Sequence, residues 1–422
     1  MYTKTRRLSR EVALVGAGMC KFGAFPDKTG RDLFVEAFQE MEASVDKGLD
    51  PEVIEAIYVG NFSSDIFEGQ VHNAPIMANW LGLIPRPATR VEDACASSGV
   101  ALREGIIAIA SGLYDVVLVG GVEKMTNLPT EDVTDTLAMA SDRLYEVPAG
   151  FTFPGLYAAL ATAYMHRYGA TVEHLMKVAI KNHANGALNP KAQFNRSIAD
   201  VMARKIAKAK ARGQPVPTWK DEWDFLHDES ANPVIAWPLR LFDCSPITDG
   251  AACLLVVAAE RAKEFTDDPI YIIGSGQASD CSPYGRADLT TLRSARVAAQ
   301  MAYEMAGVKP EDIKLAEVHD CFTIAEIIGT EDIGFFAPGE GYKAVDEGLT
   351  LRDGPKPVNT SGGLKAKGHP VGASGAAQVV EIWKQMRGEA GPRQVPGDIP
   401  LALTHNVGAT GETCVVHIFE RR

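Results

Sequence analysis

The chain carries the same order of strand and helix signals twice. Residues 12–18 read Val-Ala-Leu-Val-Gly-Ala-Gly and residues 270–276 read Ile-Tyr-Ile-Ile-Gly-Ser-Gly, so each half opens on an apolar strand that ends in Gly-x-Gly. A helix, a second strand, a strand–elbow–helix unit and a closing buried strand then follow in both halves. Short apolar runs that alternate with helices are typical of largely parallel sheets covered on both faces, and the repetition indicates a duplicated α/β architecture. The matching segments are residues 31–47, 56–60, 89–111 and 115–120 in the first half, and 292–306, 315–319, 358–386 and 401–405 in the second.

A segment of different amino-acid composition separates the two repeats. It contains a basic run at residues 204–212 and a stretch rich in Pro and Trp at residues 215–238. Because connections of this length rarely lack structure of their own, we predict an inserted loop domain. The predicted domains are residues 1–124 with 240–268 for the N-terminal half, 125–239 for the loop domain and 269–422 for the C-terminal half.

Charge and cysteine usage exclude several classes of protein. A net charge of −12 argues against nucleic acid and anionic membrane surfaces as partners, and an anionic ligand would need a local basic patch. No apolar run approaches the roughly 20 residues that cross a bilayer, and the first one, residues 12–15, is too short for a secretory signal. The seven cysteines include no C-x-x-C pair, so we expect neither a metal site nor a disulfide framework. Free thiols favour a reducing compartment, and we expect a cytoplasmic protein.

Cys95 stands where a strand is expected to turn into a helix. Extended residues 88–91 lead towards it, and a helix of small and apolar residues follows over about 99–111. Unpaired N–H groups and the helix dipole at such an elbow favour a thiolate, which would make Cys95 a nucleophile. The alternative is a buried core cysteine among small residues. Partners elsewhere in the chain decide between the two.

Three segments of the second half place polar residues where strands should end. They are residues 319–322 (His-Asp-Cys-Phe), the glycine-rich residues 359–375, and residues 405–411, which begin with His-Asn. Ligands of open α/β sheets collect outside the carboxyl ends of the strands. These segments are therefore expected to converge with Cys95 on one crevice.

Two thiols, imidazoles and glycine-exposed backbone in one crevice suit acyl transfer. One Cys takes the acyl group, a His raises its thiolate fraction, a second Cys moves a proton and N–H groups hold the oxyanion. His369 alone, between Gly and Pro, is equally well explained as structural; the combination carries the prediction. Nucleotide sites do not fit, because residues 16–18 and 274–276 lack the third glycine of a dinucleotide fingerprint. Residues 363–368 have P-loop spacing, but His-Pro follows instead of Lys-Ser/Thr.

With these motifs the chain resembles the thiolases, in particular their sterol-carrier-protein-type and archaeal-like branch. The resemblance covers nearly the whole chain. It implies a five-layered αβαβα fold with two duplicated halves and an inserted loop domain, a homodimer or homotetramer, and no cofactor beyond the coenzyme A (CoA) thioester substrates. It rests on residues 93–97 (Asp-Ala-Cys-Ala-Ser), 120–125 (Gly-Gly-Val-Glu-Lys-Met), 181–190, 319–322, 368–375 and the His-Asn-x-Gly block at 405–408.

The resemblance assigns four catalytic side chains. Cys95 matches the nucleophile that becomes acylated, and His369 matches the base that activates it. His319 matches the residue that holds the first oxyanion. Cys321 resembles the acid/base that deprotonates the acetyl-CoA methyl group in synthesis.

Backbone and CoA contacts are implied as well. The second oxyanion hole resembles the N–H of Cys95 together with backbone near Val407 or Gly408. The residues implied in CoA binding are Ser245, Lys124 and Met125.

The chain departs from many thiolases in two places, and two further features have more than one interpretation. His405 stands where they carry their second cysteine, which moves the proton shuttle to Cys321 and leaves His405 without an assigned role. Residues 215–238 are longer than expected; packed aromatics are the default interpretation, with an oligomer contact or a partner-docking surface as alternatives. The basic run at 204–212 is expected to be a solvated helix face, with binding of CoA phosphates as the alternative. Cys414 is expected in the core.

Three functions are compatible with the sequence. The leading hypothesis is reversible Claisen condensation, in which an acyl-CoA and acetyl-CoA give 3-oxoacyl-CoA and CoA through acyl-Cys95. The second is an acyltransferase or aldolase that works with a small OB-fold (zinc-ribbon) protein on a non-CoA acceptor. The third is a non-catalytic acyl-CoA-binding subunit, which would bind CoA without acylation of Cys95.

Overall fold

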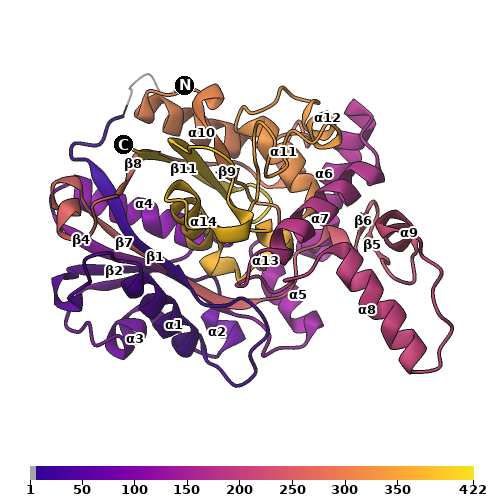
Figure 1. Ribbon diagram of the computed structural model, residues 1–422, viewed down its shortest axis with the longest axis horizontal. Coiled ribbons are helices and arrows are strands. Elements are labelled where there is room, and N and C mark those ends of the chain that lie inside the picture. Colours follow the sequence, from indigo (N-terminus) through magenta and orange to yellow (C-terminus); the bar gives the residue numbers. More distant parts are fainter. Residues whose placement is uncertain (1–5) are drawn as a thin grey trace.

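The computed structural model describes residues 6–422, so the parts of the predictions that concern residues 1–5 lie outside it. Its main sheet is mixed and crosses the whole molecule (Figure 1). The strands of this sheet are β1 (Val12–Met19), β2 (Ala56–Gly60), β3 (Ala88–Val91), β4 (Val116–Lys124), β7 (Asp249–Ala258), β8 (Ile270–Ser279), β9 (Leu315–Glu317), β10 (Leu401–Gly408) and β11 (Thr413–Arg421). Their order is β3-β2-β4-β7-β1-β8-β11-β10-β9.

The strand order confirms the duplication. Read from the edge inwards, β2-β4-β7-β1 of the first half correspond in this order to β9-β10-β11-β8 of the second. The counterpart of β3 is a single parallel bridge between Ala316 of β9 and Val358. The halves join where β1 and β8 pair antiparallel at Ala13–Tyr271 and Leu14–Ile270.

The expectation of largely parallel sheets is wrong. The parallel pairs are β2–β3, β2–β4 and β9–β10, whereas β7 and β11 run antiparallel to both of their neighbours. β11 follows β10 after only residues 409–412, and a connection this short joins only antiparallel strands. β7 holds the equivalent position in the first half and enters the sheet after the inserted segment. Most residues of both strands are apolar and buried on both faces, so their sequences look like those of parallel strands.

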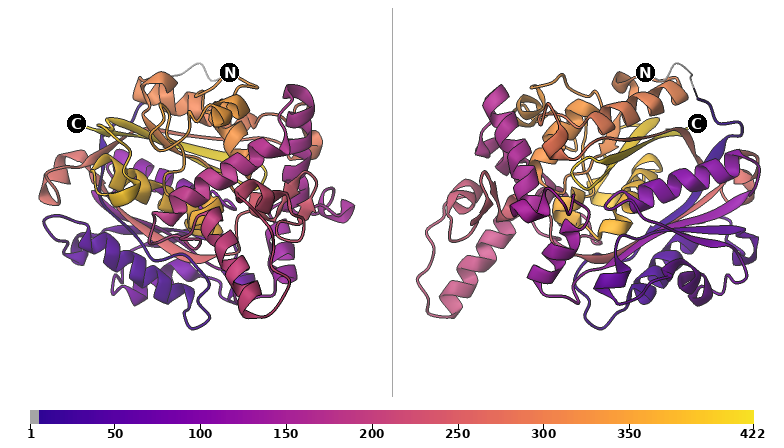
Figure 2. Two further views of the ribbon diagram at one scale, coloured as in Figure 1. Left: turned by 45° about the vertical axis from the view of Figure 1, so that its right-hand side comes forward. Right: turned by 180° about the vertical axis from the view of Figure 1, so that it is seen from behind.

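The two halves of the sheet form two of the five layers, and helices form the other three (Figures 1 and 2). α1 packs on β1 and β7 on one outer face, and α10 packs on β8 and β11 on the other. α4 and α14 contact each other and strands of both halves, so they form the middle layer. The helices of the two halves are α1 (Gly30–Ala43), α2 (Ser64–Phe67), α3 (Asn73–Trp80), α4 (Ser97–Ala110), α10 (Arg293–Ala306), α11 (Thr323–Asp332), α12 (Gly341–Asp346), α13 (Gly363–Lys367) and α14 (Ser374–Met386).

The inserted segment is folded, and part of it projects from the body in Figure 1. Trp219 donates to Asp228 at 2.7 Å and packs edge-on against Phe225, as expected for packed aromatics. Trp237, in contrast, is 62% exposed. The domain boundaries given above stay predictions. The elements of this segment are α5 (Thr130–Ala138), α6 (Phe153–Tyr168), α7 (Val172–Ala187), α8 (Ile198–Ala211), α9 (Glu222–His227) and the hairpin β5 (Val234–Ala236) with β6 (Leu239–Arg240).

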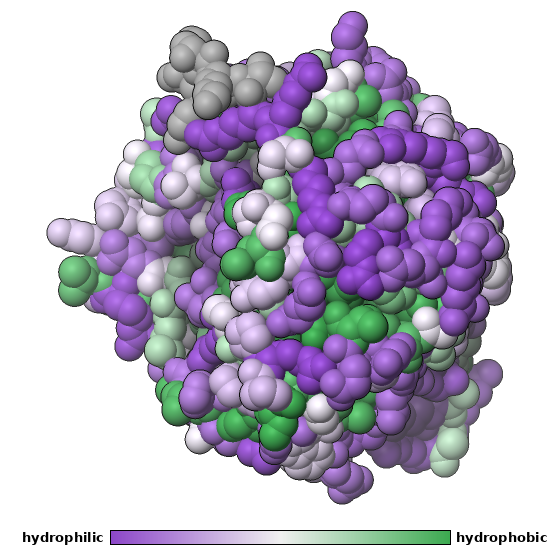
Figure 3. All heavy atoms as spheres, turned by 90° about the vertical axis from the view of Figure 1, so that its left-hand side faces the viewer, coloured by the Kyte–Doolittle hydropathy of each residue, from purple (hydrophilic) through white to green (hydrophobic). Residues whose placement is uncertain are grey.

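The surface of the molecule is mainly hydrophilic on the face that Figure 3 shows. Hydrophobic residues lie on this face in separate small groups. Within residues 6–422, no helix has the length and hydrophobicity that a membrane crossing requires. All seven cysteines are free thiols, and Cys414 is fully buried in the core as expected.

Candidate active site

Cys95 lies in a strained turn between β3 and α4, as the sequence predicts. Ala94 has a φ of 48°, a left-handed conformation that is uncommon for residues other than glycine. The hydroxyl of Ser97 holds this turn, because it donates to the Ala94 carbonyl at 2.6 Å and accepts from the Asp93 amide at 2.9 Å. Strain of this kind persists only where the surroundings fix it, and it clusters at functional sites.

The structure brings the four predicted catalytic side chains together. The thiol of Cys95 and one ring nitrogen each of His319 and His369 lie within 4.8 Å of one another. The two imidazole rings meet edge to face with centroids 5.1 Å apart. Cys95, Cys321 and His369 line one cavity of about 240 Å³. Two of the predicted CoA contacts, Ser245 and Met125, line the same cavity.

Lys124, Val407 and Gly408 do not line this cavity. The Lys124 ammonium is fully buried 2.7 Å from Asp249, so it is not available for the CoA contact assigned to it. Neither Val407 nor Gly408 lines the cavity, whereas Ala409 does. The N–H groups of Ala409 and of Cys95 itself both reach the Cys95 sulfur. The second N–H at this place therefore belongs to Ala409, in the turn that follows β10, and not to Val407 or Gly408.

The resting thiol of Cys95 is not the stabilised thiolate that its position predicts. Burial raises the pKa of Cys95 to about 12, although the Ala409 N–H opposes this shift. Desolvation disfavours the charged form of a thiol, and here it outweighs the effect of the helix terminus. A base must therefore take the proton as the sulfur attacks.

His369 has the protonation state of such a base. Burial, with the Lys367 ammonium nearby, lowers the pKa of His369 to about 3, so the ring is neutral at physiological pH. The Ser374 hydroxyl donates to the Pro370 carbonyl at 3.0 Å, and the same oxygen lies 2.6 Å from Nδ1 of His369. Since that hydroxyl proton is already used, Nδ1 must donate to Ser374. The lone pair of His369 is therefore on Nε2.

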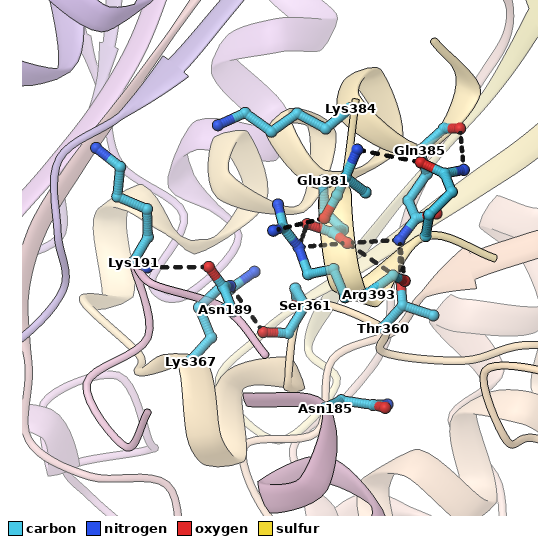
Figure 4. Close-up of polar contacts among 12 residues, drawn as sticks. Asn185, Asn189, Lys191, Thr360, Ser361, Lys367, Glu381, Lys384, Gln385 and Arg393 are labelled. Atoms are coloured by element: carbon cyan, nitrogen blue, oxygen red, sulfur yellow. Dashed lines mark hydrogen bonds and ion pairs between the residues drawn. The ribbon is translucent and has the colours of Figure 1, made fainter. Parts of the chain in front are cut away.

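A buried polar network anchors the loop before His369 (Figure 4). Asn189 donates to the Ser361 carbonyl at 2.8 Å, and the Ser361 hydroxyl donates to Glu317 at 2.5 Å. Lys367 lies 3.7 Å from the same Glu317 carboxylate. Such contacts fix the position of the His369 side chain through its backbone.

Tyr157 of α6 carries no signal in the sequence that would predict its place in the site. Its ring stacks on Phe322 with centroids 4.7 Å apart, and its hydroxyl donates to the Ala409 carbonyl at 3.1 Å. The same hydroxyl contacts the Cys321 thiol, whose pKa burial raises well above the usual value. Tyr157 belongs to the inserted segment, so no spacing within the motifs could place it here. His405 is buried beside the site, and its Nδ1 accepts the His319 amide at 3.3 Å.

Comparison with known proteins identifies the family. Residues 12–260 match the model of the thiolase N-terminal domain, and residues 276–421 match that of the thiolase C-terminal domain-like family. The chain therefore belongs to the thiolase family. It is an acyltransferase with the function of a thiolase.

Individual relatives and solved structures match nearly the whole chain. An acetyl-CoA acetyltransferase of Methanothermobacter thermautotrophicus is 44% identical over 98% of this chain and all of that protein. Sterol carrier protein 2 of Bos taurus is 32% identical over 97% of this chain and 72% of its own length. Among solved structures, the Ltp2–ChsH2(DUF35) aldolase superposes with a TM-score of 0.78 and 24% identity, over 98% of each chain. This last likeness concerns the fold alone.

Proposed function

We propose that the chain catalyses the reversible Claisen condensation of an acyl-CoA with acetyl-CoA through an acyl-Cys95 intermediate. The observation that carries this proposal is the meeting of the Cys95 thiol with His319 and His369 within 4.8 Å. As the Cys95 sulfur attacks the thioester carbonyl, Nε2 of His369 takes the thiol proton and returns it to the departing CoA sulfur. His319 holds the oxyanion that forms in this step.

In the second half-reaction, Nε2 of His369, free again after CoA has left, takes the thiol proton of Cys321 in the cavity that both residues line. The Cys321 thiolate then takes a proton from the acetyl-CoA methyl group. The resulting carbanion attacks the acyl-Cys95 carbonyl, and Cys95 leaves as a thiolate that takes the proton back from His369 as the 3-oxoacyl-CoA forms. Thiolysis is the same path in reverse. Incubation with acetyl-CoA followed by peptide mass spectrometry tests the first half: one acetyl group is expected on Cys95, and acetylation of another residue contradicts the proposal.

Cys321→Ala separates the two half-reactions. We expect the variant to form acetyl-Cys95 at a rate close to that of the wild type, because His369 and not Cys321 activates the nucleophile. Condensation should fall by about 10²- to 10⁴-fold, the usual contribution of a general acid/base. Quenched-flow acetylation and a steady-state condensation assay measure the two steps. Cys281→Ala, which removes an exposed thiol, is the control, and equal loss of both steps in Cys321→Ala would refute the division of labour.

Acetylation of Cys95 should be nearly independent of pH between 5 and 8. The pKa of His369 is lowered to about 3 and that of Cys95 is raised to about 12, so neither group titrates in this interval. A lowered histidine pKa keeps the neutral base present until the pH approaches the lowered value. Single-turnover acetylation followed at several pH values checks this. A rate that falls with a midpoint near 6.5, the ordinary pKa of histidine, would contradict it.

A basic groove beside the cavity supports binding of the CoA phosphates. The groove has a volume of about 570 Å³ and its cations are Lys21, Arg196 and Arg204, with Asp200 as the opposing charge. Gln193 belongs to its wall and donates to the carbonyl of Ile247, which lines the active cavity. Arginine clusters bind phosphate through charge-assisted hydrogen bonds. A CoA molecule would then have its phosphates at the groove and its thioester at Cys95, and would be the substrate rather than a resident cofactor.

The quaternary structure and the compartment also belong to this proposal. Exposed apolar side chains such as Val71, Ile84 and Trp237 support a homodimer or homotetramer, and a small OB-fold (zinc-ribbon) partner is the alternative occupant of such surfaces. Light scattering of the purified protein, alone and after co-purification from its source, distinguishes these assemblies. The seven free thiols support a cytoplasmic location.

A further inference from the structure

We infer that Asn406 fixes His319 as the tautomer that carries its proton on Nε2, and so makes it a hydrogen-bond donor to the oxyanion. Asn406 is a buried residue of β10. Its amide nitrogen lies 3.0 Å from the carbonyl oxygen of Cys95 and 3.1 Å from Nδ1 of His319. This inference rests on the proposed role of His319, and it makes Asn406 a positioning residue.

The two hydrogen bonds determine where the His319 proton lies. A carbonyl oxygen only accepts hydrogen bonds, so the amide nitrogen of Asn406, and not its oxygen, must face Cys95. The second N–H of that nitrogen is then directed at Nδ1 of His319, which accepts it. A neutral imidazole whose Nδ1 accepts carries its proton on Nε2.

Nε2 of His319 is the ring nitrogen left to face the reacting groups. It is buried and has no hydrogen-bond partner among residues 6–422. His369 has the opposite arrangement, since its Nδ1 donates to Ser374 and its Nε2 has the lone pair. Two imidazoles that touch edge to face are thus assigned different tasks, one as donor and one as base, by the side chain behind each of them.

The packing around Asn406 leaves space for this amide but provides hydrogen-bond partners only for its nitrogen. Its oxygen is buried without a hydrogen-bond partner among the described residues, which destabilises a fold. A Cβ on Gly99 of α4 would lie 2.7 Å from this oxygen, and a Cβ on Gly375 of α14 would lie 2.3 Å from it. Both middle helices therefore lack a side chain at the place where Asn406 fits. The two N–H bonds to Cys95 and His319 are what the side chain contributes.

Asn406→Asp tests the inference with almost no change of shape. A carboxyl oxygen in place of the amide nitrogen has at most one proton for two acceptors. When that proton serves the Cys95 carbonyl, Nδ1 of His319 must donate, and Nε2 then presents a lone pair to the oxyanion. We expect acetylation of Cys95 to slow by about 10²- to 10³-fold, the effect of losing one oxyanion donor, while KM for acetyl-CoA changes by less than about threefold.

Gln378→Glu is the matched control. Gln378 is a buried amide of α14 that donates to the His405 carbonyl at 3.1 Å, and its oxygen also lacks a partner among the described residues. It makes the same kind of bond to β10 but does not touch His319. We expect this variant to acetylate within about threefold of the wild-type rate. Similar losses in both variants would mean that a buried amide in this region is merely structural.

Nitrogen-15 NMR of histidine-labelled protein reads the tautomer directly, and His319→Gln assigns the signals. The expected result is Nε2–H for His319 in the wild type and Nδ1–H in Asn406→Asp. An unchanged tautomer in a folded Asn406→Asp variant overturns the inference. A changed tautomer with an unchanged acetylation rate instead contradicts the proposed role of His319, so the two failures are distinguishable.

Discussion

The Cys95→Ala variant is expected to form no acetyl-enzyme and to lose at least about 10⁴-fold of its condensation and thiolysis rates. The reason is geometric: His369 Nε2 then has no thiol proton to take, and the sulfur that must attack the thioester is missing. The oxyanion donors remain but stabilise no intermediate. Intact-protein mass spectrometry after incubation with acetyl-CoA, together with a thiolysis assay, measures both losses.

Acetylation of Cys321 is the result that would contradict this expectation most directly, since Cys321 lines the same cavity. If Cys321 were the nucleophile, Cys95→Ala would still take up one acetyl group, now on Cys321. Retained acetylation at Cys321 would therefore reverse the assigned roles. Binding of CoA should survive in Cys95→Ala, because Ser245, Met125 and the basic groove are unchanged, and calorimetric titration with CoA controls for misfolding.

The sequence predicted the position of Cys95 better than the state of its thiol. The strand, small residues and helix around Cys95 are local signals, and the Ala94 turn follows from them. The pKa of Cys95 depends instead on burial by the rest of the chain, which the local pattern does not contain. That is why the predicted thiolate is a buried thiol with a pKa of about 12.

The errors in the fold and in the site have a similar origin. From Gly250 to Ala258, β7 has no polar side chain because both of its faces are covered, and an apolar run does not reveal the direction in which a strand runs. Lys124 lies in a motif whose neighbour Met125 lines the cavity, yet the ammonium points to Asp249 on β7. The sequence assigns no role to Tyr157 or Asn406, because their contacts with Cys321 and His319 join segments that are far apart in the sequence.

Asp249 is the residue on which the cavity wall near Met125 most depends. This fully buried carboxylate accepts hydrogen bonds from the Lys124 ammonium at 2.7 Å, the Met125 amide at 2.8 Å and the Phe25 amide at 3.0 Å. It also accepts from the amide and the hydroxyl of Thr126, both at or below 2.8 Å. Removing one partner of a buried ion pair leaves the other charge without compensation in a low-dielectric interior. Here several amides lose their acceptor at the same time.

We therefore expect Asp249→Ala to lower the free energy of unfolding by about 3–5 kcal/mol, measured by urea denaturation. Asp267→Ala is the control, because Asp267 pairs with Lys47 at the surface and its side chain is 80% exposed. An exposed pair of this kind contributes about 0–1 kcal/mol. Lys124→Met should cost less than Asp249→Ala, because the carboxylate then keeps its backbone donors. If Asp249→Ala unfolds at the same urea concentration as Asp267→Ala, the buried pair does not hold this wall of the cavity.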